Sequence, residues 1–249
     1  MPRDKFTRRS VLALGATGAV AAAVPEAAAA ALPAITDAAG HAMPYAWRPA
    51  TDPANAPFVV VLHGAQGGKA APNPARDPNW NVLVPLDQYG PNGDGSWWVG
   101  ERGDDFTLQL LHRLVRGKRR GTRSTRPLYV VGGSMGGYGA LLHGMLLGAR
   151  AVSAVSFQSI LSRHENSIMQ HVLPSPYERL ANVLRNTDHR PMFFLGFNRF
   201  DHYFDGHFPP FLAACVETGA NFAADIRPVS GHTFGRSFAQ SLALFGSLG

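Results

Sequence analysis

The chain has 249 residues, of which 45% are hydrophobic and 16% charged, and its formal net charge is +6. This length suits one large α/β domain, and the composition excludes both a disordered chain and one embedded in a membrane throughout. Cys215 is the only cysteine, which excludes an internal disulfide, and its helical surroundings predict a small buried hydrophobe rather than a reactive thiol.

Residues 1–33 have a basic start, an apolar middle rich in Ala and Gly, and small residues at the end, which is typical of an export signal. Arg8 and Arg9 stand before the apolar run and resemble the twin-arginine signal, whose cargo crosses the membrane already folded. The apolar run is shorter than the about 20 residues that span a bilayer, although a retained anchor is the alternative. We expect cleavage, a secreted or periplasmic protein, and no stable membrane insertion after the signal is removed.

From residue 44 onward, short apolar runs rich in β-branched residues alternate with helical patterns. This order predicts an α/β fold in which a mostly parallel, doubly wound sheet carries helices on both faces. The predicted strands are 44–50, 58–64, 81–86, 127–134, 151–159, 191–197 and 221–229. The predicted helices are 106–116, 135–147, 176–185, 209–218 and 233–248. No repeat or internal linker interrupts residues 34–249, so we predict one domain there.

Two long loops, 87–105 and 159–176, follow the carboxyl ends of predicted strands, where parallel sheets bind their ligands. Trp97 and Trp98 in the first loop either line the site as an apolar or sugar-stacking platform or are buried beneath the loop. The residues 159–190 are too few for a large lid, which favours an open site for bulky or polymeric substrates.

Two charged segments could bind a metal ion or nucleic acid, but the sequence favours ordinary surface loops in both. Asp87, Asn92 and Asp94 offer oxygen ligands, but no glutamate closes the pattern as calcium loops require, so no metal site is predicted. The basic run 116–126 lies between a predicted helix and a predicted strand, and we expect a solvated connector with no nucleic-acid role.

The stretch YVVGGSMGGYGALL holds a G-x-S-x-G pattern centred on Ser134, between a predicted strand and a predicted helix. A serine at so sharp a turn has a strained backbone, and glycine at 132 and 136 removes side chains that would clash there. The start of the helix also favours negative charge near the serine. Ser134 is therefore predicted to be a nucleophile.

A serine hydroxyl needs a histidine to take its proton and a carboxylate to orient that histidine. On scaffolds with this kind of turn the chain order is serine, acid, histidine, which excludes His41, His63 and His112 as the base. His232 follows the last predicted strand directly and is the best placed of the ten histidines.

Two aspartates, Asp201 and Asp205, follow the predicted strand 191–197 and could orient the histidine. Asp201 comes first after the strand and is preferred, while Asp205 is the alternative.

A tetrahedral intermediate needs two backbone donors for its oxyanion, one of them the amide after the nucleophile, which is that of Met135. The second is predicted in the glycine-rich turn that follows the strand 58–64. His63 and Gly64 there resemble the HG signature of esterases, which makes the Ala65 amide the expected donor.

The segments LHGAQGG, GGSMGGYGALL, LGFNRFD and SGHTF, in that order, resemble the α/β-hydrolase superfamily over about residues 42–249. Within it they are similar to the esterase group that includes S-formylglutathione hydrolase, feruloyl and acetylxylan esterases and mycolyltransferases. The resemblance implies a compact α/β-hydrolase catalytic domain over residues 34–249. Because little chain precedes the strand 58–64, we expect the first strands of the full fold to be missing or abbreviated.

The resemblance implies a secreted serine hydrolase that cleaves carboxylic esters through an acyl-enzyme, with no metal or organic cofactor. The substrate is expected to be an ester, with an acylated carbohydrate, a hydroxyalkanoate polyester and a small ester left open. An acyltransferase, a serine peptidase and a non-catalytic binding protein on the same scaffold are the alternatives. The implied site consists of Ser134, Asp201 and His232 as the catalytic triad, Ala65 and Met135 as oxyanion donors, and Trp97 and Trp98 as substrate contacts.

Overall fold

The computed structural model describes residues 32–69, 77–163 and 167–248. Leu32–Gly249 forms one structural unit. The predicted export signal lies almost entirely outside the described residues, so its cleavage and route remain predictions. Within the described ranges, none of the helices has the length and apolar character needed to cross a bilayer.

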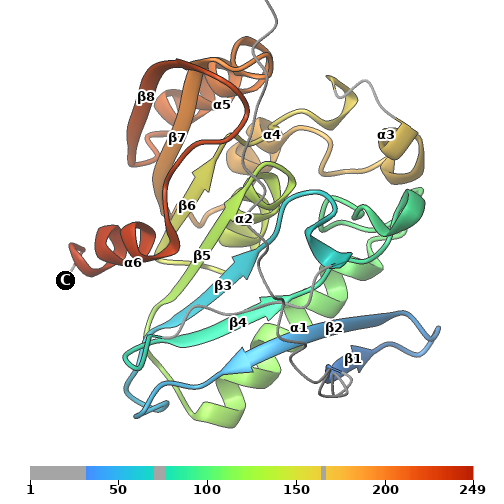
Figure 1. Ribbon diagram of the computed structural model, residues 1–249, viewed down its shortest axis with the longest axis vertical. Helices are drawn as coiled ribbons and strands as arrows, with labels where there is room; N and C mark the ends of the chain where they lie inside the picture. Colours follow the sequence, from blue (N-terminus) through green and yellow to red (C-terminus); the bar gives the residue numbers. More distant parts are fainter. Residues whose placement is uncertain (1–31, 70–76, 164–166, 249) are drawn as a thin grey trace, which may run out of the picture. The chain divides into compact units, whose positions relative to one another are not determined.

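The described residues form an eight-stranded sheet in the order β1-β2-β4-β3-β5-β6-β7-β8 (Figure 1). Strands β3 to β8 are parallel to one another, whereas β2 pairs antiparallel with both β1 and β4. The strands are β1 (Ala34–Thr36), β2 (Ala42–Arg48), β3 (Phe58–Leu62), β4 (Asn81–Pro85), β5 (Leu128–Gly133), β6 (Ala151–Val155), β7 (Met192–Phe200) and β8 (Phe222–Ser230). The predicted mostly parallel sheet is therefore confirmed.

The sequence indicated that the first strands are missing or abbreviated, and the structure has both of them, with β1 abbreviated. β1 has only three residues, too few to show an alternating pattern, and β2 has seven. The antiparallel pairing of β2 explains how so short a segment completes the sheet, because an antiparallel neighbour needs no crossover helix.

Helices cover both faces of the sheet, as predicted. They are α1 (Phe106–Thr122), α2 (Met135–Leu146), α3 (Ser167–Val172), α4 (Leu180–Asn186), α5 (Phe204–Thr218) and α6 (Phe238–Gly246), with short 3₁₀ turns at Gly67–Lys69, Pro91–Gly93 and Leu161–Arg163. Alternate residues of β3 enter different cores: Phe58 and Val60 pack with α1, α2, α4 and α5, while Val59 packs with α6. The larger core thus lies on the four-helix face.

Three helices begin elsewhere than the sequence predicts. α4 begins at Leu180 rather than at 176. α5 begins at Phe204 rather than at 209, so Pro209 and Pro210 lie inside it. Pro210 cannot donate to the carbonyl of Gly206, and Arg163 donates to that oxygen instead, at 2.8 Å. α6 begins at Phe238 rather than at 233, because Ser237 and Gln240 form a capping box. The residues 233–237 are therefore loop.

Candidate active site

Three predicted site residues lie at the carboxyl ends of parallel strands, along one edge of the sheet. Ser134 follows β5, Asp201 follows β7, and His232 lies just beyond β8. Because these ends of parallel strands lie at the same edge (Figure 1), segments far apart in the sequence meet there.

The turn that carries Ser134 joins β5 directly to α2, and Ser134 has φ 55° and ψ −123°. This conformation is strained for a residue with a side chain, so the surrounding structure has to enforce it. A Cβ at Gly132 would lie 2.0 Å from the carbonyl oxygen of Gly136, and one at Gly136 would lie 2.1 Å from that of Leu62. Glycine at both positions is therefore a steric requirement of the turn.

A continuous hydrogen-bonded chain connects the three side chains. His232 Nδ1 lies 2.8 Å from Asp201 Oδ2, and His232 Nε2 lies 2.8 Å from Ser134 Oγ. A carboxylate only accepts, so Nδ1 carries the proton and Nε2 is left to accept from the serine hydroxyl. This is the protonation pattern that a general base for Ser134 needs.

The structure separates the two aspartates that the sequence left open. Asp201 is 5% exposed, and its carboxylate also accepts from the amide of Tyr203 at 3.0 Å. Burial alone would raise the pKa of Asp201, but the hydrogen bonds from His232 and Tyr203 outweigh it and the net pKa is lower than usual. Asp205 is exposed and pairs with Arg199 at 2.9 Å.

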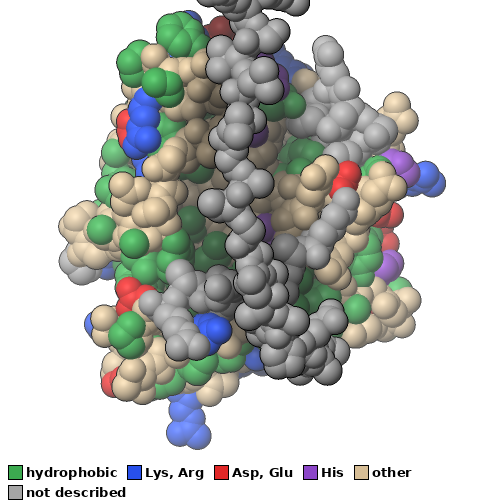
Figure 2. Space-filling view, in the orientation of Figure 1, with side chains coloured by type: hydrophobic (Ala, Val, Ile, Leu, Met, Phe, Trp, Pro, Cys, Tyr) green, Lys and Arg blue, Asp and Glu red, His purple; other side chains and the backbone are tan. Residues whose placement is uncertain are grey.

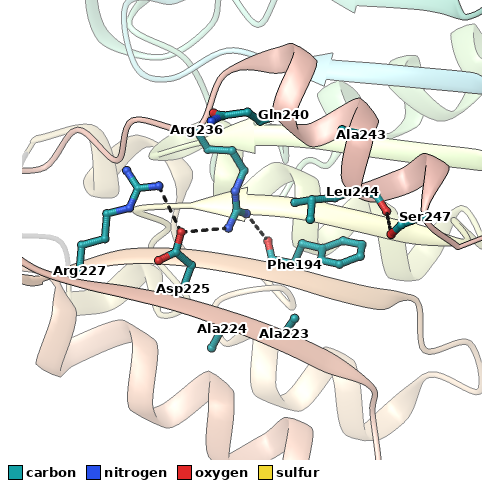
Figure 3. Close-up of a pocket in the computed structure, with 10 residues that line it drawn as sticks. All are labelled: Phe194, Ala223, Ala224, Asp225, Arg227, Arg236, Gln240, Ala243, Leu244 and Ser247. Atoms are coloured by element: carbon teal, nitrogen blue, oxygen red, sulfur yellow. Dashed lines mark hydrogen bonds and ion pairs between the residues drawn. The ribbon is translucent and has the colours of Figure 1, made fainter.

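The loop that carries His232 is attached to the sheet beyond the histidine itself. Phe234 packs against Gly196, where an added Cβ would lie 2.7 Å from the ring. Arg236 donates to the carbonyl of Phe194 at 2.9 Å and lies 4.0 Å from Asp225 (Figure 3). Sequence reasoning missed these anchors because it assigned residues 233–237 to a helix.

The turn after β3 lies against the nucleophile. A Cβ at Gly64 would lie 3.6 Å from Ser134 Cβ. The amide of Met135 is at the first position of α2 and has no acceptor within that helix. Ala65 is exposed in a turn, and within the described part of the chain its amide has no acceptor. The structure therefore brings the two predicted oxyanion donors to the same end of the sheet as Ser134, and their catalytic role remains a prediction.

His63 fixes the peptide that contains the Ala65 amide. Its Nε2 accepts from the amide of Asp87 at 2.9 Å, so its Nδ1 carries the proton and donates to the carbonyl of Gly64 at 2.7 Å. Burial lowers the pKa of His63, which keeps the ring neutral. His63 is thus a structural residue of the turn, consistent with its exclusion as the base.

Trp97 and Trp98 are not an exposed platform, and of the two interpretations the structure supports burial. Their side chains are 1% and 0% exposed. The Trp98 ring packs against α2, where a Cβ at Gly139 would lie 2.5 Å from it, and its Nε1 donates to the carbonyl of His63 at 3.3 Å. Trp98 therefore lies between the nucleophile helix and the turn after β3, and the predicted substrate contacts are corrected to core residues.

Asp87 organises the loop around these tryptophans. Its buried carboxylate accepts from the amides of Ser96 and Trp98 at 2.7 and 2.9 Å. Burial raises the pKa of Asp87, and these hydrogen bonds offset part of the rise. Among the described residues, no group of three or more His, Cys, Asp or Glu could hold a metal ion.

Two further observations concern the surface charge and the single cysteine. On the face shown in Figure 2, the charged side chains of the described residues lie mainly toward the margins. Cys215 is buried, and burial raises the pKa of its thiol to about 12, so it is not a nucleophile at neutral pH.

Comparison with solved structures identifies the fold. A capsule O-acetyltransferase from Neisseria meningitidis has a TM-score of 0.61 at 16% identity, covering 87% of this chain and 94% of that chain. An S-formylglutathione hydrolase from Staphylococcus aureus has a TM-score of 0.57 at 11% identity, covering 86% and 95%. A glycosylation-associated protein complex from Streptococcus agalactiae has a TM-score of 0.61 at 19% identity, and this chain spans only 45% of that chain.

The chain therefore has the α/β-hydrolase fold, and its predicted resemblance to the esterase group is confirmed at the level of the fold. No protein-family model and no curated protein matches the sequence.

Proposed function

We propose that this protein is a serine hydrolase that cleaves carboxylic esters. The observation that carries the proposal is the chain from Asp201 through His232 to Ser134, with 2.8 Å at both steps. Similar folds among S-formylglutathione hydrolases support the choice of an ester or thioester carbonyl. The secreted or periplasmic location expected from Arg8 and Arg9 is part of the same proposal.

In the proposed mechanism, Ser134 Oγ attacks the ester carbonyl carbon while its proton passes to His232 Nε2. The amides of Met135 and Ala65 donate to the oxyanion that forms. The tetrahedral intermediate expels the alcohol, which takes the proton from His232, and leaves an acyl group on Ser134. Water then attacks this acyl-enzyme with His232 again as the base, so the acid is released and Ser134 is regenerated.

Acyl transfer is the second candidate, in which an alcohol replaces water in the last step. The similarity to a capsule O-acetyltransferase over 94% of that chain favours it. The two candidates share every step up to the acyl-enzyme, so they differ only in the acceptor.

A fluorophosphonate probe tests the nucleophile. We expect the probe to label the wild-type protein and the exposed-serine control Ser162→Ala, but not Ser134→Ala. Hydrolysis of a set of acetyl, feruloyl and longer acyl esters should fall on the order of 10⁴-fold or more in Ser134→Ala, with little change in the melting temperature.

Product analysis with and without an added alcohol then separates hydrolysis from transfer. Labelling or turnover that persists in Ser134→Ala would contradict the proposed mechanism. Labelling of the wild type with no turnover of any ester would indicate a different acyl substrate on the same nucleophile.

A further inference from the structure

Asn198 lies in β7, three residues before Asp201, and is 3% exposed. Its side-chain amide donates two hydrogen bonds, to the carbonyl of Gly231 at 2.8 Å and to the carbonyl of Thr233 at 3.1 Å. These two residues stand immediately before and after His232. The Asn198 side chain therefore bridges the backbone on both sides of the candidate base.

This bridge restrains the orientation of His232. The carbonyl of Gly231 belongs to the peptide unit directly before His232, and that of Thr233 to the second peptide unit after it. Holding both limits the movement of the backbone between them. Gly231 and Thr233 are exposed, and among the described residues no other group donates to their carbonyls. Gly231 has φ 92°, and as a glycine it can adopt many backbone conformations, so it does not fix the loop by itself. The segment next to His232 therefore depends on Asn198 for its fixed geometry.

The main chain of Asn198 restrains the acid as well. The amide of Asp201 donates to the carbonyl of Asn198 at 3.1 Å, closing the turn that follows β7. One residue thus holds the turn of the acid through its backbone and the loop of the base through its side chain. The distance between Asp201 and His232 depends on both contacts.

The far end of the histidine loop has separate anchors. Arg236 donates to the carbonyl of Phe194 and to Ser153 Oγ, at 2.9 and 3.3 Å, and the Phe194 contact is visible in Figure 3. Phe234 is 4% exposed and packs on Gly196. Loss of the Asn198 side chain should therefore leave the loop attached to the sheet while freeing the segment around His232.

We propose that Asn198 is a positioning residue, whose side-chain amide sets the orientation of His232 between Asp201 and Ser134. The inference rests on the proposed function only for its kinetic consequence, since the geometry it describes can be measured without turnover. Asn198 touches none of the reacting atoms and acts through the backbone of the loop.

Asn81 provides a matched control for Asn198. It is also a buried asparagine whose side-chain amide donates to two carbonyls, those of Pro53 and Ala56, at 2.9 and 3.2 Å. It is the first residue of β4 and so lies at the amino ends of the parallel strands, whereas the candidate site lies at their carboxyl ends. Asn81 Oδ1 also accepts from the amide of Ala50 at 3.2 Å. Asn81→Ala therefore removes three hydrogen bonds against two in Asn198→Ala, and it should lower thermal stability at least as much.

The kinetics of the two variants should differ. With enzyme concentration set by fluorophosphonate titration, Asn198→Ala should lower kcat on the order of 10- to 100-fold with KM changed less than about 2-fold, because misplacing a base costs rate rather than binding. Asn81→Ala should keep the wild-type kcat. Asn198→Ser, which retains one donor, should lie between wild type and Asn198→Ala.

A spectroscopic readout separates this proposal from the proposed function. The proton between His232 Nδ1 and Asp201 should give a far-downfield NMR resonance in the wild type and in Asn81→Ala, and the resonance should broaden or disappear in Asn198→Ala. A sharp resonance together with wild-type kcat in Asn198→Ala would overturn the positioning role. Equal losses of kcat in both alanine variants would also overturn it. A wild type that shows the resonance but cleaves no ester would overturn the proposed function alone.

Discussion

At the scale of single residues, the role of a side chain in the candidate site depends on what it contacts and not only on its type. Asp201 and Asp205 are four positions apart, yet one is buried against His232 and the other is exposed and paired with Arg199. An exposed ion pair contributes little to stability and nothing to the orientation of the histidine. The two aspartates are therefore a matched pair for mutation.

We predict that Asp201→Asn lowers kcat/KM on the order of 10² to 10⁴-fold, because an amide leaves the imidazole without its charge partner and permits the wrong tautomer. Asp205→Asn should keep kcat/KM within about 2-fold, since its carboxylate lies in a surface pair. Steady-state kinetics on one ester measures both variants. A larger loss in Asp205→Asn than in Asp201→Asn would reverse the assignment of the acid.

Single residues could be predicted from the sequence where they occupy a fixed position in a known motif or in the order of the strands. Ser134 stands at the centre of a G-x-S-x-G pattern, and His232 follows the last strand, so both positions could be predicted. Asn198 carries no motif, because its role depends on a loop 33 residues later in the chain. Trp97 and Trp98 were ambiguous because an aromatic pair in a loop looks the same in sequence whether it faces solvent or core.

At the scale of elements, Gly136 and Gly121 both lie in helices but differ in how much space surrounds them. A Cβ at Gly136 would lie 2.1 Å from the carbonyl oxygen of Leu62, within the turn that holds the nucleophile. Gly121 lies in the last turn of α1, and a Cβ there meets nothing within 4 Å. The first glycine is required by packing and the second only costs backbone entropy.

We predict that Gly136→Ala lowers the free energy of unfolding by more than about 2 kcal/mol and abolishes labelling of Ser134, because α2 must move away from β3. Gly121→Ala should raise the free energy of unfolding by about 0.4–1 kcal/mol and keep full labelling, since alanine favours an open helical position. Urea denaturation and fluorophosphonate labelling measure the two effects. A stable, fully labelled Gly136→Ala protein would show that the close approach can relax.

Element boundaries were less predictable than element types. The central parallel strands are continuous apolar runs and were predicted within a few residues, whereas β1 was missed because three residues show no period. The start of α5 was misplaced because Pro209 suggests a first helical position, while Arg163 supplies the hydrogen bond that permits an earlier start. Such compensation comes from outside the element and leaves no local signal.

At the scale of the whole molecule, a buried pair of histidines links helices α1 and α2 to the loop 87–105, which carries Trp97 and Trp98 and is called the tryptophan loop below. His112 of α1 lies 3.1 Å from His143 of α2, and His143 Nε2 lies 2.9 Å from the carbonyl of Trp98. A carbonyl only accepts, so His143 Nε2 carries its proton and Nδ1 accepts from His112. The ring of His143 is therefore neutral in this arrangement.

Burial lowers the pKa of His112 to about 4, and burial also holds the pKa of His143 well below its ordinary value. In the unfolded chain both histidines take up protons near pH 6.5. Between pH 6.5 and pH 4 the unfolded state therefore binds more protons than the folded state, so the free energy of unfolding falls as the pH falls. The contribution of His112 is fully present above pH 6.5 and amounts to on the order of 3 kcal/mol.

We predict that urea denaturation of the wild-type protein shows this loss between pH 6.5 and pH 4, and that His112→Asn reduces the slope by about one proton because His143 still titrates. Asparagine keeps an N–H donor for His143, which limits the loss of packing to the ring itself. Gly121→Ala is the control, because it changes an open position of α1 without removing an ionisable group, so it should leave the slope unchanged. Parallel curves for wild type and His112→Asn would mean that the pair opens to solvent and protonates within the folded state, and the link between α1, α2 and the tryptophan loop would then be breakable without unfolding.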